Sequence, residues 1–399
     1  MTPTARVEIK RGRALPLWLG HPWVYSGAIR QLHGSPAAGD VVEVVDESGR
    51  RIGEGFFNPV SQIRVRLVAR AGEKLDDALL ARRIHDAAAL RRTLLGLPRE
   101  GTDAFRVVNA EGDGLPGLSV DHYAGVLVAQ FGSVGLRRHA AAVWEALSAA
   151  WDPRALVELR ATGAEAEGLG DEAAAAVVRG ELPPEGVDVR EGGLRWRVSP
   201  LGGQKTGWFC DQRENRRRFA AYARGRTVLD LYCYAGGFGL TALGAGATAA
   251  TLVDSSGRAV GRAREHAELN GFADRATCVE ADVFRFLAAA AERGDRWEAV
   301  VLDPPKFARG RAGAEAAARG YRKLHGAALR VLAPGGVLAT ASCTTQARAA
   351  ELARTLGEAA YDVGRAVTVL ESAGAAPDHP VRLPCTEGDY LTFLVSRAD

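Results

Sequence analysis

Residues 227–240 read Thr-Val-Leu-Asp-Leu-Tyr-Cys-Tyr-Ala-Gly-Gly-Phe-Gly-Leu, an apolar run that passes into a glycine-rich turn. The run predicts a buried parallel strand. Gly236, Gly237 and Gly239 predict a tight turn into a helix whose first N–H groups lack partners. Such a strand–turn–helix unit holds nucleoside-bearing ligands at the carboxyl end of a parallel sheet. A dinucleotide and S-adenosylmethionine are the two cofactors that fit this pattern.

Three acidic residues follow successive apolar runs and help to choose between these cofactors. At Asp230, just before the glycines, a carboxylate would repel a pyrophosphate but could accept hydrogen bonds from the cationic amino group of methionine. Asp254 ends the next run and could accept both ribose hydroxyls, while Asp282 ends a third and could lie near the adenine. Each acid alone could equally cap a helix. Together, at three strand ends, they favour S-adenosylmethionine.

The composition is that of a globular protein large enough for two or three domains. The 399 residues include 51 basic and 48 acidic side chains, so any nucleic-acid surface must be local. The clusters that could form one are Lys10, Arg11 and Arg13, and Arg213, Arg216, Arg217 and Arg218. The five cysteines lack metal-ligand spacing, and no apolar run reaches about 18 residues. We therefore expect reduced thiols, no metal, no membrane span and a cytoplasmic location.

The pattern divides the chain into three predicted domains, residues 1–75, 76–195 and 196–399. The first shows the alternation of half-buried strands, for example at 40–46, and predicts a small β domain. The second mixes helical periodicity with turns and a strand at 126–131, which predicts a compact α/β domain. The third alternates buried strands with helices, as in a parallel sheet.

Two further strand ends carry residues suited to chemistry. Residues 303–307 read Asp-Pro-Pro-Lys-Phe; the prolines predict a rigid turn that could hold a flat ring beside the cofactor, with Phe307 available for stacking. Residues 342–344 read Ser-Cys-Thr after the next strand. Most buried cysteines are inert, but Cys343 lies at the same crevice before an expected helix start that would lower its pKa. It is therefore a candidate nucleophile.

A polar loop precedes the glycine turn. Residues 203–213 read Gly-Gln-Lys-Thr-Gly-Trp-Phe-Cys-Asp-Gln-Arg, and we expect this loop to border the cofactor. Capping of the following helix by Asp211 is the plainer interpretation. An acidic turn at 111–117 could be structural or could face the substrate.

Residues 20–27, Gly-His-Pro-Trp-Val-Tyr-Ser-Gly, and 53–59, Gly-Glu-Gly-Phe-Phe-Asn-Pro, resemble the PUA domain, a small RNA-binding β barrel. The resemblance implies that His21 and Trp23 could contact RNA, by reading and by stacking on a base. Without it, His21 is more often a packed or capping residue, and Trp23 is more often part of the core.

The motifs at 230–239, 303–307 and 342–344, in this order, resemble those of bacterial class I S-adenosylmethionine-dependent ribosomal RNA cytosine-5 methyltransferases with an N-terminal PUA domain. Residues 203–213, the acidic turn and 378–380 fit as well. The resemblance implies an α/β protein with a C-terminal Rossmann-like sheet, an N-terminal PUA-type β barrel and a central α/β domain. It also implies S-adenosylmethionine as cofactor and free or partly assembled large-subunit ribosomal RNA as partner, with a homodimer left open.

The resemblance also assigns roles to residues. The cofactor site would comprise Asp230, Tyr232, Gly236, Gly237, Phe238, Asp254, Asp282, Phe209, Gln212, Asp303 and Pro304. The RNA contacts would comprise Lys205, Arg213, Lys306, Phe307, His21 and Trp23. Carbon 5 of cytosine is a poor nucleophile until a thiolate adds to carbon 6, which would be the role of Cys343. Asp303 would protonate or hydrogen-bond the ring nitrogen, given a raised pKa.

Other functions stay open. Many such enzymes have a second cysteine where Lys306 follows Pro305, so the base that resolves the adduct is unassigned. The Asp-Pro-Pro-aromatic pattern also occurs in methyltransferases that modify guanine or adenine nitrogens without a thiol; Cys343 argues against this alternative. A non-catalytic RNA-binding or ribosome-assembly protein is the alternative from another class, and the acids at all three strand ends argue against it.

Overall fold

The computed structural model describes residues 3, 5–161, 163–170, 175–202, 206–307, 313–344 and 348–399. The chain forms two compact units. The first comprises Met1–Arg190, Arg197–Cys210 and Pro377–Gly388, and the second Glu191–Trp196, Asp211–Ala376 and Asp389–Asp399. The division at residues 75 and 195 stays a prediction. Among the described residues, no helix combines the length and apolar character needed to cross a membrane.

The first unit begins with a six-stranded sheet in the order β2-β6-β5-β4-β1-β3. The strands are β1 (Ala5–Ile9), β2 (Trp23–Tyr25), β3 (Ile29–His33), β4 (Val41–Val45), β5 (Arg51–Phe57) and β6 (Ile63–Arg70), with the short helix α1 (Leu15–Trp18) between β1 and β2. The alternation predicted at 40–46 appears as β4. A Cβ on Gly53 would lie 2.1 Å from the Ala69 carbonyl oxygen, so β5 can approach β6 only with glycine there.

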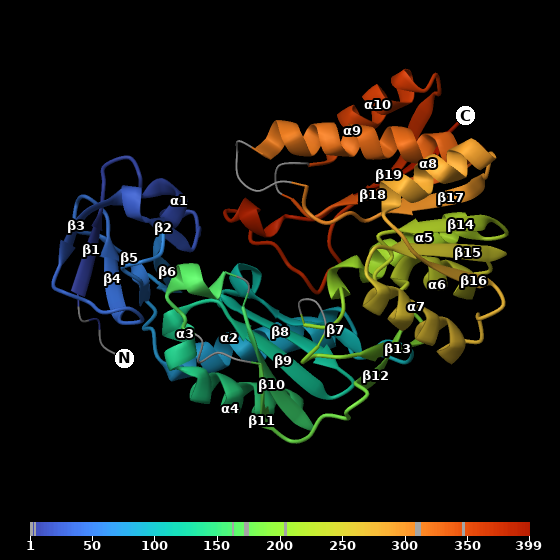
Figure 1. The fold of residues 1–399 in the computed structure, drawn as a ribbon. Helices are drawn as coiled ribbons and strands as arrows, with labels where there is room; N and C mark the ends of the chain where they lie inside the picture. Colours follow the sequence, from blue (N-terminus) through green and yellow to red (C-terminus); the bar gives the residue numbers. More distant parts are fainter. Residues whose placement is uncertain are drawn as a thin grey trace. The chain divides into compact units, whose positions relative to one another are not determined.

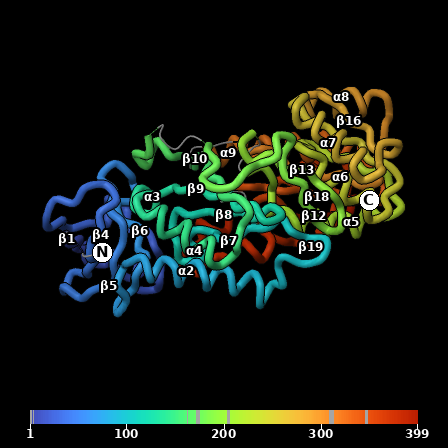
Figure 2. Tube along the Cα trace, turned by 90° about the horizontal axis from the view of Figure 1, so that it is seen from below, coloured from blue at the N-terminus to red at the C-terminus, as the bar shows by residue number. Residues whose placement is uncertain are grey.

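A second sheet in this unit has the order β11-β10-β9-β8-β7. Its strands are β7 (Ala104–Asn109), β8 (Leu118–Tyr123), β9 (Val126–Phe131), β10 (Ala155–Arg160) and β11 (Ala176–Arg179); the helices are α2 (Asp77–Ala89), α3 (Val134–Arg138) and α4 (Ala140–Trp151). Helices α2 and α4 pack together against this sheet (Figure 2). Phe56 and Val68 of the first sheet belong to the same core as Phe105 and Val120 of the second, so the two sheets share their buried apolar surface.

The acidic turn at 111–117 is structural. Arg91 is fully buried and donates two hydrogen bonds to the Asp113 carboxylate, at 2.6 and 2.9 Å, and one to the Asp378 carbonyl at 2.6 Å. A Cβ on Gly112 would lie 1.9 Å from the Pro380 carbonyl oxygen. Residues 378–380 therefore pack directly against this turn, so the motifs at 111–117 and 378–380, far apart in the sequence, are in contact.

Replacing Arg91 should destabilise this unit strongly. In Arg91→Ala the Asp113 carboxylate stays buried without its cation, which costs about 3–5 kcal/mol. Arg82, in α2, is the matched control: its side chain is 55% exposed and pairs with Glu73, so Arg82→Ala should cost less than about 1 kcal/mol. Denaturant unfolding of both variants measures this; equal losses would contradict the structural role of Arg91.

The second unit contains a seven-stranded sheet in the order β16-β15-β14-β17-β18-β20-β19. Its strands are β14 (Thr227–Leu231), β15 (Ala249–Asp254), β16 (Ala276–Glu280), β17 (Trp297–Leu302), β18 (Leu332–Ser342), β19 (Val367–Ala373) and β20 (Thr392–Ala398). Strands β14 to β18 are parallel to one another, and β20 is antiparallel to both β18 and β19. The hairpin of β12 (Val187–Glu191) and β13 (Leu194–Val198) precedes them.

Helices cover both faces of this sheet. They are α5 (Arg213–Ala223), α6 (Gly237–Gly244), α7 (Gly257–Leu269), α8 (Val283–Arg293), α9 (Ala314–Val331) and α10 (Ala349–Asp362). Helices α5, α6 and α7 lie on one face, and α8, α9 and α10 on the other (Figure 1). The strand order reverses at β14, where β15 pairs on one side and β17 on the other. The carboxyl ends of β14 and β17 therefore form the point at which open α/β sheets bind ligands.

Candidate active site

The loop after β14 is held between its two neighbouring strands. The Cys233 N–H donates to the Val253 carbonyl of β15 at 3.0 Å, and the Asp303 N–H donates to the Leu231 carbonyl at 3.4 Å. Tyr232 and Tyr234 have φ angles of 61° and 48°, a left-handed conformation that costs a non-glycine residue on the order of 1–3 kcal/mol. These contacts hold the loop in its strained shape beside the glycine turn.

The glycines fit the turn and the helix closely. Gly236 has φ 81° and directly precedes α6. A Cβ on Gly239 would lie 2.2 Å from Leu252 Cδ2, so only glycine lets α6 approach β15 this closely. The first turn of α6 therefore lies directly against the ends of the central strands.

Asp230 is buried at the centre of this arrangement. Its Oδ2 accepts the Gly239 N–H at 2.8 Å, whereas its Oδ1 is buried and meets no donor among the described residues. Burial raises the pKa of the Asp230 carboxyl to about 7, with smaller contributions from the charges of Asp303 and Asp254; the Gly239 hydrogen bond opposes the rise. Asp230 thus stabilises α6 and still has one oxygen that could accept a hydrogen bond.

Asp254 and Asp282 lie where the sequence predicted, but with different surroundings. Asp254 is half-buried and accepts N–H groups from Tyr234 and Ser256, each at 2.9 Å, one on each oxygen. Asp282 is exposed and caps α8 by accepting the Arg285 N–H at 3.0 Å, so the capping interpretation holds for this residue. Burial first, and then the charges of Asp282 and Asp254, raise the pKa of Tyr232 to about 12, so both carboxylates lie within electrostatic reach of this phenol.

Asp303 follows β17 and is fixed by a short hydrogen-bonded chain. Its Oδ2 accepts from Gln212 Nε2 at 3.1 Å, and Gln212 Oε1 accepts from Asn215 Nδ2 at 2.7 Å. Asn215 is fully buried and also donates to the Gly374 carbonyl at 3.0 Å. The motif's first proline, Pro304, is buried while Lys306 is exposed. The side chains of Gln212 and Asn215 thus orient the Asp303 carboxylate.

Cys343 follows β18 directly and is half-buried. Strand β18 is parallel to β17 and pairs with it, so Cys343 and Asp303 follow adjacent carboxyl ends. The expected helix start after the cysteine is wrong in position, because α10 begins only at Ala349; residues 345–347 lie outside the described part of the chain. A helix dipole acts within its first turn, so α10 gives no ground for a lowered thiol pKa.

Sequence reasoning missed Tyr321, a buried residue of α9 beside both strand ends. Its hydroxyl oxygen makes no hydrogen bond of good geometry within the described residues, and its ring meets Phe307 edge-on at 4.9 Å. Burial first raises the pKa of Tyr321, and the charges of Cys343 and Asp303 add to the rise. Tyr321 therefore lies near both candidate catalytic residues. No sequence signal marks it, since one tyrosine in an amphipathic helix is ordinarily core.

The sequence predicts site roles for Phe238, Phe209 and Lys205, and the structure contradicts only the first of these predictions. Phe238 is a core residue rather than a cofactor contact: its ring stacks on Phe393 at 5.8 Å and packs edge-on against Phe219. Phe209 belongs to the first unit, and its cofactor contact stays a prediction. Lys205 lies outside the described residues.

The arginines at 213–218 are ion-paired rather than gathered in a basic patch. Arg213 is buried, with Nε 3.4 Å from a Glu214 oxygen, which argues against its predicted RNA contact. Arg216 pairs with buried Glu191 at 2.6 and 2.7 Å. Arg217 pairs with Glu214 and Arg218 with Glu371. The N-cap residue of α5 is Gln212 rather than Asp211, and its side chain makes no capping hydrogen bond; Asp211 accepts from the Tyr390 hydroxyl at 2.7 Å.

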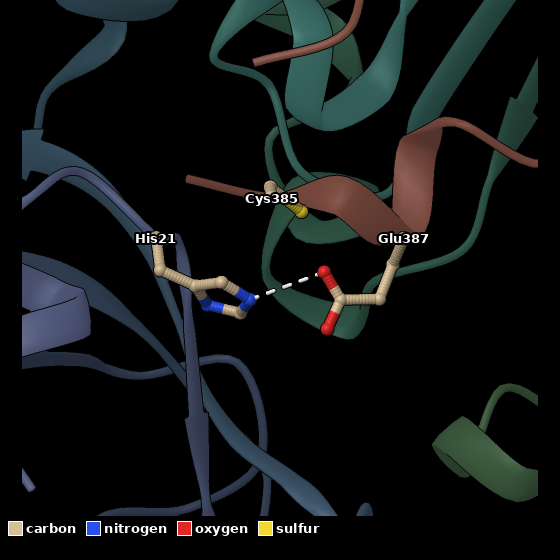
Figure 3. Close-up of side chains that lie close together, drawn as sticks. All are labelled: His21, Cys385 and Glu387. Atoms are coloured by element: carbon tan, nitrogen blue, oxygen red, sulfur yellow. Dashed lines mark hydrogen bonds and ion pairs between the residues drawn. The ribbon is translucent and has the colours of Figure 1, made fainter. Parts of the chain in front are cut away.

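His21 and Trp23 lie in the first unit and have partners there. His21 Nδ1 accepts the Trp23 N–H at 3.1 Å, so the neutral ring carries its proton on Nε2, which faces Glu387 Oε2 at 3.4 Å (Figure 3). With both nitrogens engaged and the residue 9% exposed, His21 is poorly placed to read a base. Trp23 is half-buried and donates from Nε1 to Glu111 at 2.9 Å, so its stacking on RNA stays a prediction.

The ligand atoms of His21, Cys385 and Glu387 lie within 4.8 Å of one another (Figure 3). A metal bound to Nε2 would need the ring proton on Nδ1, where it would oppose the Trp23 N–H. Burial, followed by the charges of Glu111 and Glu387, raises the pKa of the Cys385 thiol to about 12, which disfavours the thiolate that a metal requires. The geometry therefore argues against a metal at this cluster.

Comparisons with known proteins bear on the family. Residues 7–70 match the PUA-like domain, and residues 167–386, more than half of the chain, match the S-adenosylmethionine-dependent methyltransferase family. A ribosomal RNA large subunit methyltransferase I from Aeromonas hydrophila is 38% identical and covers 99% of this chain and 100% of its own. One from Photobacterium profundum is 37% identical, with coverages of 97% and 98%. The chain belongs to the S-adenosylmethionine-dependent methyltransferase family that includes the ribosomal RNA large subunit methyltransferases I.

Solved structures share the whole fold. A protein from Streptococcus mutans described as a SAM-dependent methyltransferase has a TM-score of 0.84, 19% identity, and coverages of 98% and 99%. A second structure, of a methyltransferase complexed with SAH, has a TM-score of 0.85 at the same identity and coverages. For this family member the predicted fold class is confirmed: an α/β chain with an N-terminal PUA-like domain and a C-terminal methyltransferase domain.

The cofactor of this methyltransferase family is S-adenosylmethionine. The described residues fit it chemically. Buried Asp230 Oδ1 is an acceptor without a donor, which suits an ammonium group. Each Asp254 oxygen accepts one N–H group and keeps capacity for a ribose hydroxyl. A Cβ on Gly239 would also lie 3.3 Å from Asp230 Oδ2, so the glycine keeps the space around this carboxylate open.

Proposed function

We propose that this chain methylates carbon 5 of a cytosine in large-subunit ribosomal RNA through a covalent bond between Cys343 and the base. The names of its relatives support the RNA, since they are ribosomal RNA large subunit methyltransferases. The observation that carries the chemistry is the position of a cysteine and a carboxylate after adjacent parallel strands, β18 and β17, with Tyr321 near both.

The cofactor residues follow from their surroundings. Asp230 would accept from the methionine ammonium, Asp254 would accept the ribose hydroxyls, and Tyr232 beside Asp282 would border the adenosine. The backbone of Gly236 and Gly237 would line the turn, while Gln212, Asp303 and Pro304 would close the side next to β17. S-adenosylmethionine, when bound, supplies an electrophilic methyl group on a sulfonium.

The residues of the chain would activate the base. The Cys343 thiolate adds to carbon 6 of cytosine, so the sulfur–carbon bond forms and the electron pair of the ring double bond moves to carbon 5. Asp303 donates a hydrogen bond or proton to the ring nitrogen and stabilises the adduct. After methylation a base removes the carbon 5 proton, the double bond re-forms and the thiolate leaves. The base that removes this proton is unassigned. Phe307 would stack on the cytosine ring.

Tritiated methyl transfer to unmodified large-subunit ribosomal RNA, followed by nucleoside analysis, tests this proposal. We expect 5-methylcytidine. A methylated guanine or adenine nitrogen would replace the proposed chemistry with the thiol-free alternative, and no transfer on any RNA would favour the RNA-binding alternative. Whether the substrate is naked or partly assembled, and whether the chain forms a homodimer, stay predictions.

The raised pKa of Asp230 predicts how cofactor affinity depends on pH. An ammonium group binds the ionised carboxylate, which the cofactor-free protein holds only above about pH 7. From pH 7.5 to 6 we therefore expect affinity for S-adenosylmethionine to fall roughly tenfold by calorimetry. The range stays below the α-amino pKa of about 7.7–8.0, so most of the ligand carries its ammonium charge throughout.

The raised pKa of Asp230 also affects the stability of the cofactor-free protein, which should decrease with rising pH while cofactor affinity increases. The folded state holds the proton more tightly than the unfolded chain, whose pKa is near 3.8, so stability decreases as pH rises from about 4 to 7. Asp230→Asn should bind weakly and should lose the pH dependence. A wild-type affinity that is flat between pH 6 and 7.5 would remove Asp230 from the ammonium site.

A further inference from the structure

Three arginines from separate segments converge in the first unit. Arg70 ends β6, Arg83 lies in α2, and Arg382 belongs to Pro377–Gly388. A Cβ on Gly114 would lie 3.5 Å from both Arg382 Nη2 and Arg83 Nε, so these two guanidinium groups are close together. Burial, followed by the charges of Arg382 and Arg83, lowers the pKa of Arg70 to about 10, so the third cation is within electrostatic reach.

The acids around these arginines are already engaged. The Glu73 carboxylate accepts from Arg83 at 2.9 and 3.1 Å and from Arg82 at 3.0 Å. Asp113 is the bidentate partner of buried Arg91. Arg83 Nε is buried without an acceptor among the described residues. Within the same part of the chain, the Arg382 side chain makes no hydrogen bond or ion pair; its backbone carbonyl accepts the Cys385 N–H at 2.7 Å. The cluster therefore carries unbalanced positive charge.

This arrangement is unfavourable in the absence of an anion. Burial first, and then Arg83, lower the pKa of the half-buried Arg382, the signature of desolvated like charges. A phosphate group would relieve the repulsion, because guanidinium forks match its oxygens and bind them in pairs. The side chains of Arg382 and Arg70 are partly exposed, so an anion can reach them.

The surroundings favour a nucleic-acid phosphate. Arg70 donates from Nη1 to the Leu17 carbonyl at 3.2 Å and from Nη2 to the Gly20 carbonyl. Its guanidinium therefore lies against the loop that opens residues 20–27, the stretch that resembles PUA domains. An anion bound here would contact both the PUA-like domain and the returning segment Pro377–Gly388.

We propose that Arg70, Arg83 and Arg382 form a binding site for a phosphate group, and that its occupant is a backbone phosphodiester of the RNA substrate. The choice of RNA rests on the proposed function, whereas the phosphate site does not. The site positions RNA without reading its sequence and lies outside the residues assigned to the reaction.

The test compares wild type, Arg382→Ala and Arg382→Lys as full-length chains. Binding of a large-subunit ribosomal RNA fragment is measured by fluorescence anisotropy between about 50 and about 300 mM salt. We expect Arg382→Ala to weaken binding about tenfold near 0.1 M salt and to reduce the slope of log affinity against log salt by about 1. Arg382→Lys should restore the slope but only part of the affinity, because it keeps the charge and loses the fork.

Two controls keep the result interpretable. Arg354 is half-exposed on α10 and pairs with Glu351 and Glu358, so Arg354→Ala should leave RNA binding unchanged. Inorganic phosphate should raise the melting temperature of wild type but not of Arg382→Ala, which reports on the site without RNA. Calorimetry with S-adenosylmethionine should give the same affinity for both proteins.

Each outcome decides between named alternatives. Suppose that phosphate no longer raises the melting temperature of Arg382→Ala, while RNA binding by this variant is unchanged. This result would assign the site to free phosphate and would overturn RNA as its occupant. Equal phosphate shifts and equal salt slopes in both proteins would overturn the site itself. Neither result would contradict the proposed function, because nucleoside analysis identifies the product in a separate experiment. The RNA-binding measurement also does not depend on which base is methylated.

Discussion

Cys343→Ala should abolish methyl transfer, with a loss of at least about a thousandfold, while affinity for S-adenosylmethionine should stay within about twofold of wild type. The expected loss is large because without the thiolate carbon 5 of cytosine never becomes nucleophilic. The affinity stays because Asp230 and Asp254, at the other strand ends, do not depend on the thiol. Single-turnover methyl transfer and calorimetry measure the two quantities.

RNA with 5-fluorocytosine at the target position tests the covalent step directly. Wild type should form a complex that survives denaturing electrophoresis, because fluorine cannot leave carbon 5 as the proton does. Cys278→Ala is the matched control: Cys278 is also half-buried in the same sheet, on β16, and burial raises the pKa of its thiol. It should trap and turn over like wild type. Full methylation by Cys343→Ala would end the covalent mechanism and favour nitrogen methylation.

The parts of the site that could be predicted from sequence are those with local signals. Asp230, Asp254 and Asp303 lie at or directly after the strand ends where apolar runs placed them, since a parallel strand and the residue that ends it are adjacent in the chain. The glycine turn is also predictable, because Gly236 has the positive φ that a tight turn requires; the close approach that requires glycine at 239 involves Leu252 of β15.

The remaining features depend on partners distant in sequence. In the sequence, Arg216 belongs to a basic cluster, but in the folded protein it pairs with Glu191, a residue 25 positions earlier in the chain. Arg218 pairs in the same way with the distant Glu371. Phe238 follows the glycines in sequence, yet the turn of α6 directs its ring into the core. Tyr321 approaches Cys343 and Asp303 only because α9 packs over β18, a register that no local pattern encodes.

Asp254→Ala should weaken S-adenosylmethionine binding about a hundredfold. The ribose hydroxyls would lose the carboxylate that accepts their two charge-assisted hydrogen bonds, together on the order of 3 kcal/mol. The Tyr234 and Ser256 N–H groups, which it accepts at 2.9 Å, would also lose their partner, so the strained loop after β14 would be held less firmly. Calorimetry measures the affinity, and thermal unfolding reports any general loss of structure.

A ligand that lacks one ribose hydroxyl distinguishes the two possible causes of weaker binding by Asp254→Ala, a lost contact to the ribose and a loosened loop. Against wild type, 2′-deoxy S-adenosylhomocysteine should bind about tenfold more weakly than S-adenosylhomocysteine, since one hydrogen bond to a carboxylate is absent. Against Asp254→Ala the two ligands should bind equally, because their difference depends on the carboxylate. An undiminished preference for the ribose in Asp254→Ala would show that Asp254 acts only through the Tyr234 and Ser256 N–H groups, as a support of the loop.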